Sequence, residues 1–148
     1  MALQKGQKAP AFTLKNQDGE QRSLSDILKK GPMVLFFFPK AFTRVCTQEA
    51  CSFGDQIERF ESVNAQVFGI STDSVSTLKK FEKKHNLSYE LLSDEKGKVS
   101  KKYDAYVPIM GISSRVTYVI DTDGSIKEVY SSMFQAAPHI QKALKSLE

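Results

Sequence analysis

Short apolar runs alternate along this chain with segments whose apolar residues recur every three or four positions. Residues 33–38 (MVLFFF) and 66–71 (QVFGIS) have the length of a buried strand, whereas a membrane-spanning helix needs about 20 apolar residues. The segment between them, residues 43–63, has helical spacing and predicts a helix. This alternation predicts an α/β fold, in which a central mixed sheet carries helices on both faces.

The rest of the chain continues the pattern to its end. We expect strands at residues 11–14, 89–92, 115–120 and 125–130, and helices at residues 23–28, 73–85, 94–103 and 138–147. The Asp-Thr-Asp-Gly segment at residues 121–124 predicts a hairpin turn between the last two strands. No repeat, low-complexity tract or linker divides the 148 residues, so we expect residues 1–148 to form a single domain.

Composition excludes several classes of protein. Hydrophobic residues make up 41% of the chain and charged residues 26%, as in an ordinary globular protein, and two cysteines are too few for a disulfide scaffold. The first eight residues lack the apolar region of a secretory signal, which favours a thiol-reducing compartment and a cytoplasmic location. We expect no membrane association.

The net charge of +4 is concentrated in one segment. Residues 79–102 contain eight lysines against four acidic residues, and no arginine. A nucleic-acid surface would be expected to combine arginine with stacking aromatic residues, so we interpret this segment as a solvated face and expect no nucleic-acid partner.

The two cysteines, Cys46 and Cys51, lie five residues apart after the apolar run 33–38. If Thr43 is the N-cap of the following helix, Cys46 is its third residue, where free N–H groups and the helix dipole favour a thiolate. On an intact helix the two Cα atoms would be about 8.6 Å apart, whereas a disulfide needs them within about 7 Å. A bond between these cysteines therefore requires the first turns of the helix to unwind.

The surroundings of Cys46 resemble a known family. Pro39, Thr43 and Cys46 match the pattern P-x-x-x-[T/S]-x-x-C of the peroxiredoxins, which are thiol peroxidases with a thioredoxin-like fold. The continuation CTQEAC at residues 46–51 is similar to the Q-type subfamily, also called bacterioferritin comigratory protein. Further similarity lies in residues 6–14, 36–40, 115–121 and 133–140, so that the resemblance covers nearly the whole chain.

This resemblance implies a role for five residues. Cys46 would be the peroxidatic cysteine, which attacks a hydroperoxide and becomes a sulfenic acid. Thr43 would hydrogen-bond the peroxide, and Pro39 would shield the thiolate from water. Arg115 would stabilise the thiolate and the charge on the breaking O–O bond, while Glu49, one turn after Cys46, would hold the guanidinium of Arg115.

The resemblance also implies the partners of the reaction. Cys51 would be the resolving cysteine, forming an intramolecular disulfide that thioredoxin or a similar dithiol reduces. No metal or organic cofactor is implied, and Q-type members are mostly monomeric, so we expect a monomer.

Other interpretations stay open at this point. Cys51 could be a buried thiol that does not resolve, which would make the chain a one-cysteine peroxidase, and the chain could serve as a redox-regulated binding or chaperone protein. A dithiol oxidoreductase or a copper chaperone is disfavoured by the five-residue spacing, and glutathione-peroxidase chemistry by the absence of tryptophan.

Two further features of the sequence bear on the site. Ala41, Arg44 and Val45 depart from the usual Q-type loop P-K-D-x-T-P-G-C, and Arg44 would further favour the thiolate if it faced inward. His85 and His139 have no partner at metal-ligand spacing, so we expect both on the surface.

Overall fold

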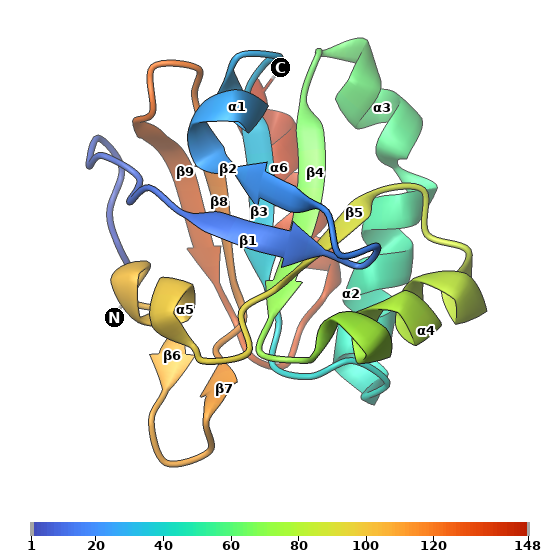
Figure 1. Cartoon of the computed structure of the whole chain (residues 1–148). Coiled ribbons are helices and arrows are strands. Elements are labelled where there is room, and N and C mark those ends of the chain that lie inside the picture. The colour runs from blue at the N-terminus through green and yellow to red at the C-terminus, as the bar shows by residue number, and fades with distance from the viewer. Residues whose placement is uncertain (1, 148) are drawn as a thin grey trace.

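A computed structural model describes residues 2–147 of the chain (Figure 1). Its helices are α1 (Leu24–Leu28), α2 (Arg44–Asp55), α3 (Ile57–Ser62), α4 (Val75–His85), α5 (Lys98–Lys102) and α6 (Ala137–Leu147). Its strands are β1 (Thr13–Asn16), β2 (Gln21–Ser23), β3 (Met33–Phe37), β4 (Gln66–Ser71), β5 (Glu90–Ser93), β6 (Tyr106–Val107), β7 (Ile112–Ser113), β8 (Val116–Ile120) and β9 (Ile126–Ser131).

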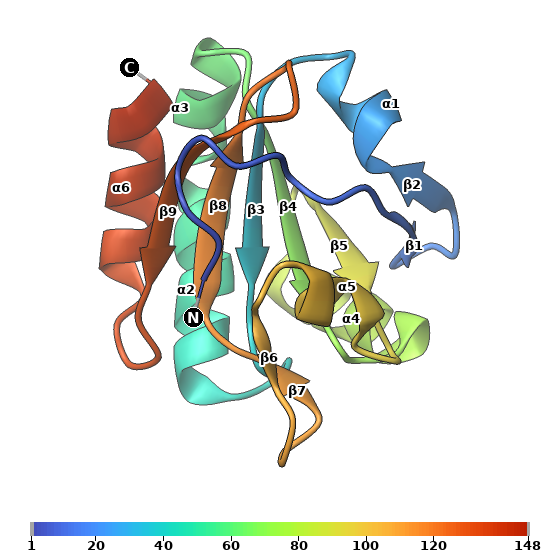
Figure 2. The same ribbon diagram turned by 90° about the vertical axis from the view of Figure 1, so that its left-hand side faces the viewer.

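Within the described residues, seven strands form one mixed sheet in the order β2-β1-β5-β4-β3-β8-β9. The central strand β3 pairs in parallel with β4 and antiparallel with β8. Figure 2 shows α2, α3 and α6 on one face of the sheet and α1 and α5 on the other. The prediction of a central mixed sheet with helices on both faces is confirmed.

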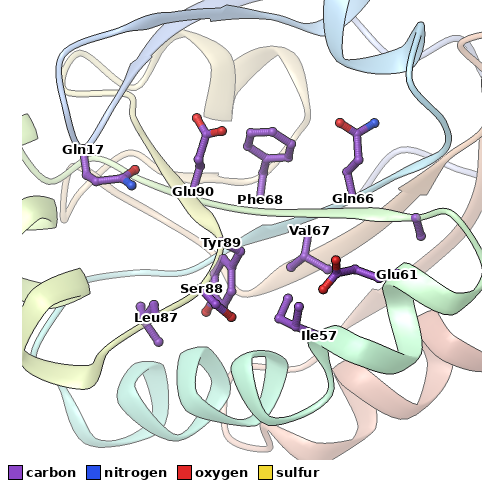
Figure 3. Close-up of a pocket in the computed structure, with 11 residues that line it drawn as sticks. Gln17, Ile57, Glu61, Gln66, Val67, Phe68, Leu87, Ser88, Tyr89 and Glu90 are labelled. Carbon is purple, nitrogen blue, oxygen red and sulfur yellow. The ribbon is translucent and has the colours of Figure 1, made fainter.

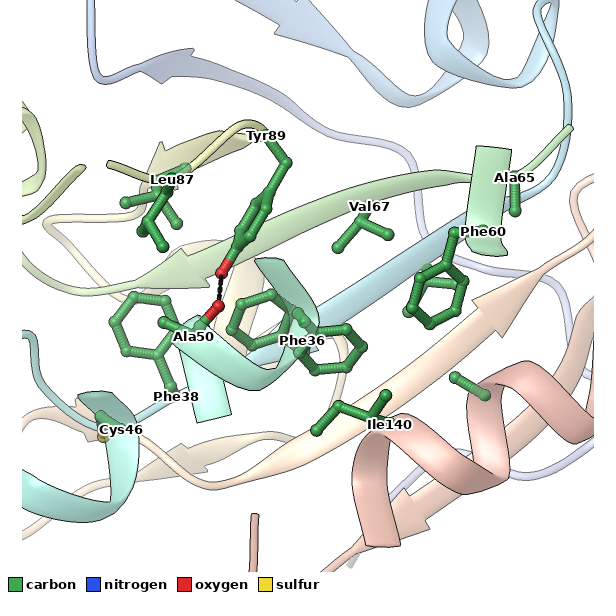
Figure 4. Packing of buried hydrophobic residues seen from close by; sticks show 14 of the residues in the cluster. Phe36, Phe38, Cys46, Ala50, Phe60, Ala65, Val67, Leu87, Tyr89 and Ile140 are labelled. Atoms are coloured by element: carbon green, nitrogen blue, oxygen red, sulfur yellow. Dashed lines mark hydrogen bonds between the residues drawn. The ribbon is translucent and has the colours of Figure 1, made fainter. Parts of the chain in front are cut away.

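The apolar run in β3 is explained by burial on both faces. Phe36 and Phe38 pack into the cluster beneath α2, α3, α4 and α6, whereas Leu35 and Phe37 pack into the opposite cluster with α1 and α5. Figure 4 shows the first cluster, in which the Phe36 ring stacks on Phe53 of α2 with 4.3 Å between ring centroids. This packing fixes α2 against the sheet, and α2 carries both cysteines.

Three local expectations differ from the structure, and strand β2 was not expected. The segment 43–63 forms two helices, because the backbone at Gln56 leaves the helical conformation (φ −107°, ψ 10°). Ser74, and not Asp73, caps α4 by accepting a hydrogen bond from the backbone N–H of Thr77. The helix expected from residue 94 starts only at Lys98, after Gly97 in the left-handed conformation (φ 70°). The short hairpin of β6 and β7 was not expected.

In the described part of the chain, no helix combines the length and the apolar composition needed to cross a membrane.

Candidate active site

The site lies where β3 ends and the chain turns into α2 (Figure 1). Thr43 occupies the N-cap position of α2 by its backbone conformation, and Cys46 is the third residue of the helix, as the sequence predicted. The Thr43 side chain makes no capping hydrogen bond; its hydroxyl donates to the Lys40 carbonyl at 2.6 Å and is exposed. Pro39 is half-buried, whereas the Cys46 side chain is 1% exposed.

The loop before α2 is held by a residue of another element. The Asp73 carboxylate, just after β4, accepts a hydrogen bond from the backbone N–H of Ala41 at 2.8 Å and from the Ser71 hydroxyl at 2.7 Å. Sequence reasoning assigned Asp73 to a helix cap and missed this contact, which joins residues 32 positions apart. Arg44 is exposed, so its charge does not face inward.

Arg115 reaches Cys46 from the neighbouring strand. It directly precedes β8, whose Val116 pairs with Phe37 at the end of β3, so the register places Arg115 beside the carboxyl end of β3. Its Nη2 lies 3.2 Å from Cys46 Sγ, and its Nη1 donates to Glu49 Oε1 at 2.6 Å. The guanidinium therefore contacts a sulfur and a carboxyl group at the same time, and all three side chains are buried.

Arg115 has a further anchor that the sequence did not reveal. Its Nε donates to the Met133 carbonyl at 3.0 Å, which links the guanidinium to the segment between β9 and α6. This contact lies within residues 133–140, which sequence reasoning had noted only for their resemblance to the family.

Glu49 is completely buried, and one of its oxygens is unusual. Burial raises the pKa of Glu49 to about 8, although the charge and hydrogen bond of Arg115 act in the opposite direction. Glu49 Oε2 has no hydrogen-bond partner among the described residues, and His139 Nδ1 lies 3.5 Å from it.

The expectation that His139 lies on the surface is wrong. Its side chain is 0% exposed, its Nδ1 lies 2.7 Å from the Thr117 hydroxyl, and its Nε2 lies 3.0 Å from the Ser132 carbonyl. Burial lowers the pKa of His139 to about 4. His85, by contrast, is partly exposed and packs edge-on against Phe81.

Cys51 lies on the same unbroken helix as Cys46, is partly exposed, and is a free thiol like Cys46. Burial and the nearby Asp55 carboxylate raise the pKa of the Cys51 thiol. The residue before it, Ala50, accepts a hydrogen bond from the Tyr89 hydroxyl at 2.6 Å (Figure 4). Both cysteines are thus free thiols on an intact helix α2.

A pocket of about 380 Å³ lies away from this site, beside α3, β4 and the start of β5 (Figure 3). Its lining includes Ile57, Glu61, Gln66 and Tyr89 but neither cysteine nor Arg115. Among the described residues, no group of three or more histidine, cysteine or acidic side chains could hold a metal ion. The polar array around Cys46 is therefore the candidate active site.

Comparison with known proteins agrees with the geometry. The model of the AhpC/TSA family matches residues 5–129. The chain is 42% identical to the chloroplastic peroxiredoxin Q of Populus jackii and 43% identical to that of Suaeda salsa, in each case over 99% of this chain and 68% of the relative. Because these relatives are chloroplastic, the cytoplasmic location stays a prediction.

Solved structures give the same result. The peroxidoxin BcpB of Mycobacterium tuberculosis superposes with a TM-score of 0.94 at 40% identity, covering 98% of this chain and 96% of that one. A PrxQ mutant of Xylella fastidiosa superposes with a TM-score of 0.89 at 25% identity, covering 99% and 96% of the two chains.

Proposed function

The chain belongs to the AhpC/TSA family and is a peroxidase of the peroxiredoxin class, and we propose that it reduces hydroperoxides through Cys46 with Cys51 as the resolving residue. The observation that carries this proposal is the buried contact between Arg115 Nη2 and Cys46 Sγ at 3.2 Å. A cation at this distance from the sulfur, together with the N-terminal end of α2, stabilises negative charge at this position during the attack on peroxide.

In the first step the thiolate of Cys46 attacks the terminal oxygen of the hydroperoxide. An S–O bond forms as the O–O bond breaks, so the sulfur is oxidised by two electrons to a sulfenic acid and the peroxide is reduced. The departing oxygen takes up a proton and leaves as water or as an alcohol. Arg115 stabilises the negative charge on the breaking bond, the exposed Thr43 hydroxyl binds the peroxide, and Pro39 restricts water.

In the second step Cys51 attacks the sulfenic sulfur, which forms the disulfide and releases water. Both residues lie on the intact helix α2, which keeps them too far apart for a disulfide, so the helix unwinds before the bond can form. A dithiol such as thioredoxin then reduces the disulfide by exchange, which restores the two thiols. The alternative is that Cys51 does not resolve and an external thiol reduces the sulfenic acid directly.

Variants of the two cysteines test both steps. Rapid mixing of the reduced protein with hydrogen peroxide, followed by thiol counting, should show no turnover for Cys46→Ser and a single fast turnover ending in sulfenic acid for Cys51→Ser. Mass spectrometry of the oxidised wild-type protein should show a peptide linking Cys46 to Cys51.

Full activity of Cys46→Ser would overturn the assignment of the peroxidatic residue. Continued turnover of Cys51→Ser with thioredoxin would establish the one-cysteine alternative. We also propose that the protein acts as a monomer, because every residue of this cycle lies in one chain; a disulfide between two chains would contradict this.

A further inference from the structure

The carboxyl group of Glu49 has two oxygens in different situations. Oε1 accepts a hydrogen bond from Arg115, whereas Oε2 is buried without a hydrogen-bond partner. A buried carboxylate oxygen that lacks a donor has lost its hydration without replacing it, which costs free energy. Some feature of the site must therefore offset the burial of Oε2.

The orientation of His139 defines what faces this oxygen. The Ser132 carbonyl can only accept a hydrogen bond, so Nε2 of His139, 3.0 Å away, carries a hydrogen. In a neutral ring Nδ1 then has a free lone pair, which accepts from the Thr117 hydroxyl at 2.7 Å. The edge-on contact with the Tyr130 ring, at 4.8 Å between centroids, keeps the imidazole in this orientation.

An ionised Glu49 would accordingly place a second lone pair 3.5 Å from that of Nδ1, with no hydrogen between them. A proton on Oε2 removes this repulsion, because its partial positive charge is attracted to Nδ1 3.5 Å away, even though the Nδ1 lone pair already accepts from the Thr117 hydroxyl. We propose that Glu49 is protonated on Oε2 in the reduced protein and that His139 is a positioning residue whose Nδ1 stabilises this proton.

The electrostatics of the site agree with this placement. Burial raises the pKa of Glu49 to about 8 and lowers the pKa of His139 to about 4, so near neutral pH the pair holds its proton on Glu49. The charged and titratable groups beside the pair among the described residues are Arg115, which also contacts the Cys46 sulfur, Tyr89 near Glu49, and Tyr130, whose ring packs against His139. Arg115 favours the deprotonated form of both partners; at Glu49 burial outweighs this effect, whereas at His139 burial acts in the same direction.

The consequence for catalysis rests on the function proposed above. A protonated Glu49 still accepts a hydrogen bond from Arg115 and keeps the guanidinium in place, but it does not neutralise its charge. The full positive charge therefore remains available to the sulfur 3.2 Å away. Above about pH 8 the Glu49 carboxylate competes for this charge, so the rate with peroxide should decline.

Infrared spectroscopy tests the proton directly and does not depend on peroxidase activity. The difference spectrum of the reduced wild-type protein minus Glu49→Gln, recorded well below pH 8, should contain the band of a protonated carboxyl group. This band should disappear with a midpoint near pH 8. A spectrum that shows only a carboxylate band under these conditions would overturn the proposal.

Three variants of the surroundings separate a positioning role from a merely structural one. His139→Phe removes the lone pair that faces Oε2 and should lower the midpoint by up to about one pH unit, the upper limit set by a full hydrogen bond. Thr117→Val removes the competing donor, so Nδ1 is left to Glu49 alone and the midpoint should rise. His139→Asn, whose amide oxygen can replace Nδ1, should restore part of the shift and serves as the replacement where His139→Phe fails to fold.

Equal midpoints in wild type, His139→Phe and Thr117→Val, or in wild type and Thr117→Val where His139→Phe fails to fold, would show that the ring does not act on the proton and would overturn the role of His139. If the band of the protonated carboxyl group is present but the protein has no peroxidase activity, the proposed function is contradicted, whereas the protonation of Glu49 still stands.

Discussion

Replacing Tyr89 by phenylalanine should accelerate disulfide formation between Cys46 and Cys51. The Tyr89 hydroxyl donates to the carbonyl of Ala50, the residue that precedes Cys51 on α2, at a distance of 2.6 Å. Tyr89 is a buried residue of the cluster beneath α2 and packs edge-on against Phe36 (Figure 4). Unwinding α2 up to Cys51 breaks this hydrogen bond, so the bond opposes resolution.

The size of the effect follows from this single bond. A buried neutral hydrogen bond contributes about 0.5–1.5 kcal/mol, because the groups can bond to water once they are exposed. Its removal lowers the free energy of local unwinding by this amount and raises the unwound population by roughly twofold to 13-fold. The ring itself is retained in Tyr89→Phe, so the packing against Phe36 is preserved.

The assay mixes reduced protein with one equivalent of hydrogen peroxide and traps the remaining thiols at increasing times. Mass spectrometry then gives the rate at which the sulfenic acid becomes a disulfide. Tyr103→Phe is the matched control, because the Tyr103 hydroxyl also donates to a carbonyl at 2.6 Å, that of Pro10, within the opposite cluster. An unchanged rate in Tyr89→Phe, or equal acceleration in the control, would refute the reasoning.

Two other substitutions address the site and the sheet. Arg115→Ala removes a charged partner of Cys46 worth roughly 1.5–3 kcal/mol, so the second-order rate with peroxide should decrease about 10- to 150-fold; a decrease below twofold in stopped-flow measurements would contradict its role. Gly69→Ala places a Cβ only 2.8 Å from Phe36 Cζ and from Leu91 Cδ2, and overpacking of this kind costs about 1–3 kcal/mol. Calorimetry should show a lower melting temperature for Gly69→Ala, whereas an unchanged value would mean that the sheet accommodates the methyl group.

The sheet was predictable from sequence because burial on both faces leaves a distinct pattern. A strand covered by helices on each side has apolar residues throughout; β3 occupies all but the last residue of the predicted segment 33–38, and β4 occupies residues 66–71. The break at Gln56 left no comparable mark. Apolar residues continue at helical spacing from Phe53 through Ile57 to Phe60, so the periodicity passes through the break without change.

The burial of His139 could not be deduced from its neighbours in the sequence. What makes a buried imidazole acceptable is a pair of hydrogen bonds, and its partners Thr117 and Ser132 lie 22 and 7 residues away. One signal was present, because His139 lies four residues before Ala143 on the inward face of α6. A histidine on the apolar face of a helix is buried together with that face, but only the structure shows which groups form its hydrogen bonds.

Helix α2 must satisfy two opposite requirements, and the contact between Arg115 and Cys46 connects them. The intact helix places the sulfur and Glu49 beside one guanidinium, which the proposed attack on peroxide uses, whereas the proposed disulfide needs the same turns unwound. Oxidation itself changes the balance, because the neutral sulfenic acid is attracted to Arg115 less strongly than the thiolate. The added oxygen must also fit around a side chain that is only 1% exposed. The chemical step thus weakens the contacts that keep α2 closed, and hydrogen exchange at the amides of α2 should be faster in oxidised Cys51→Ser than in the reduced variant.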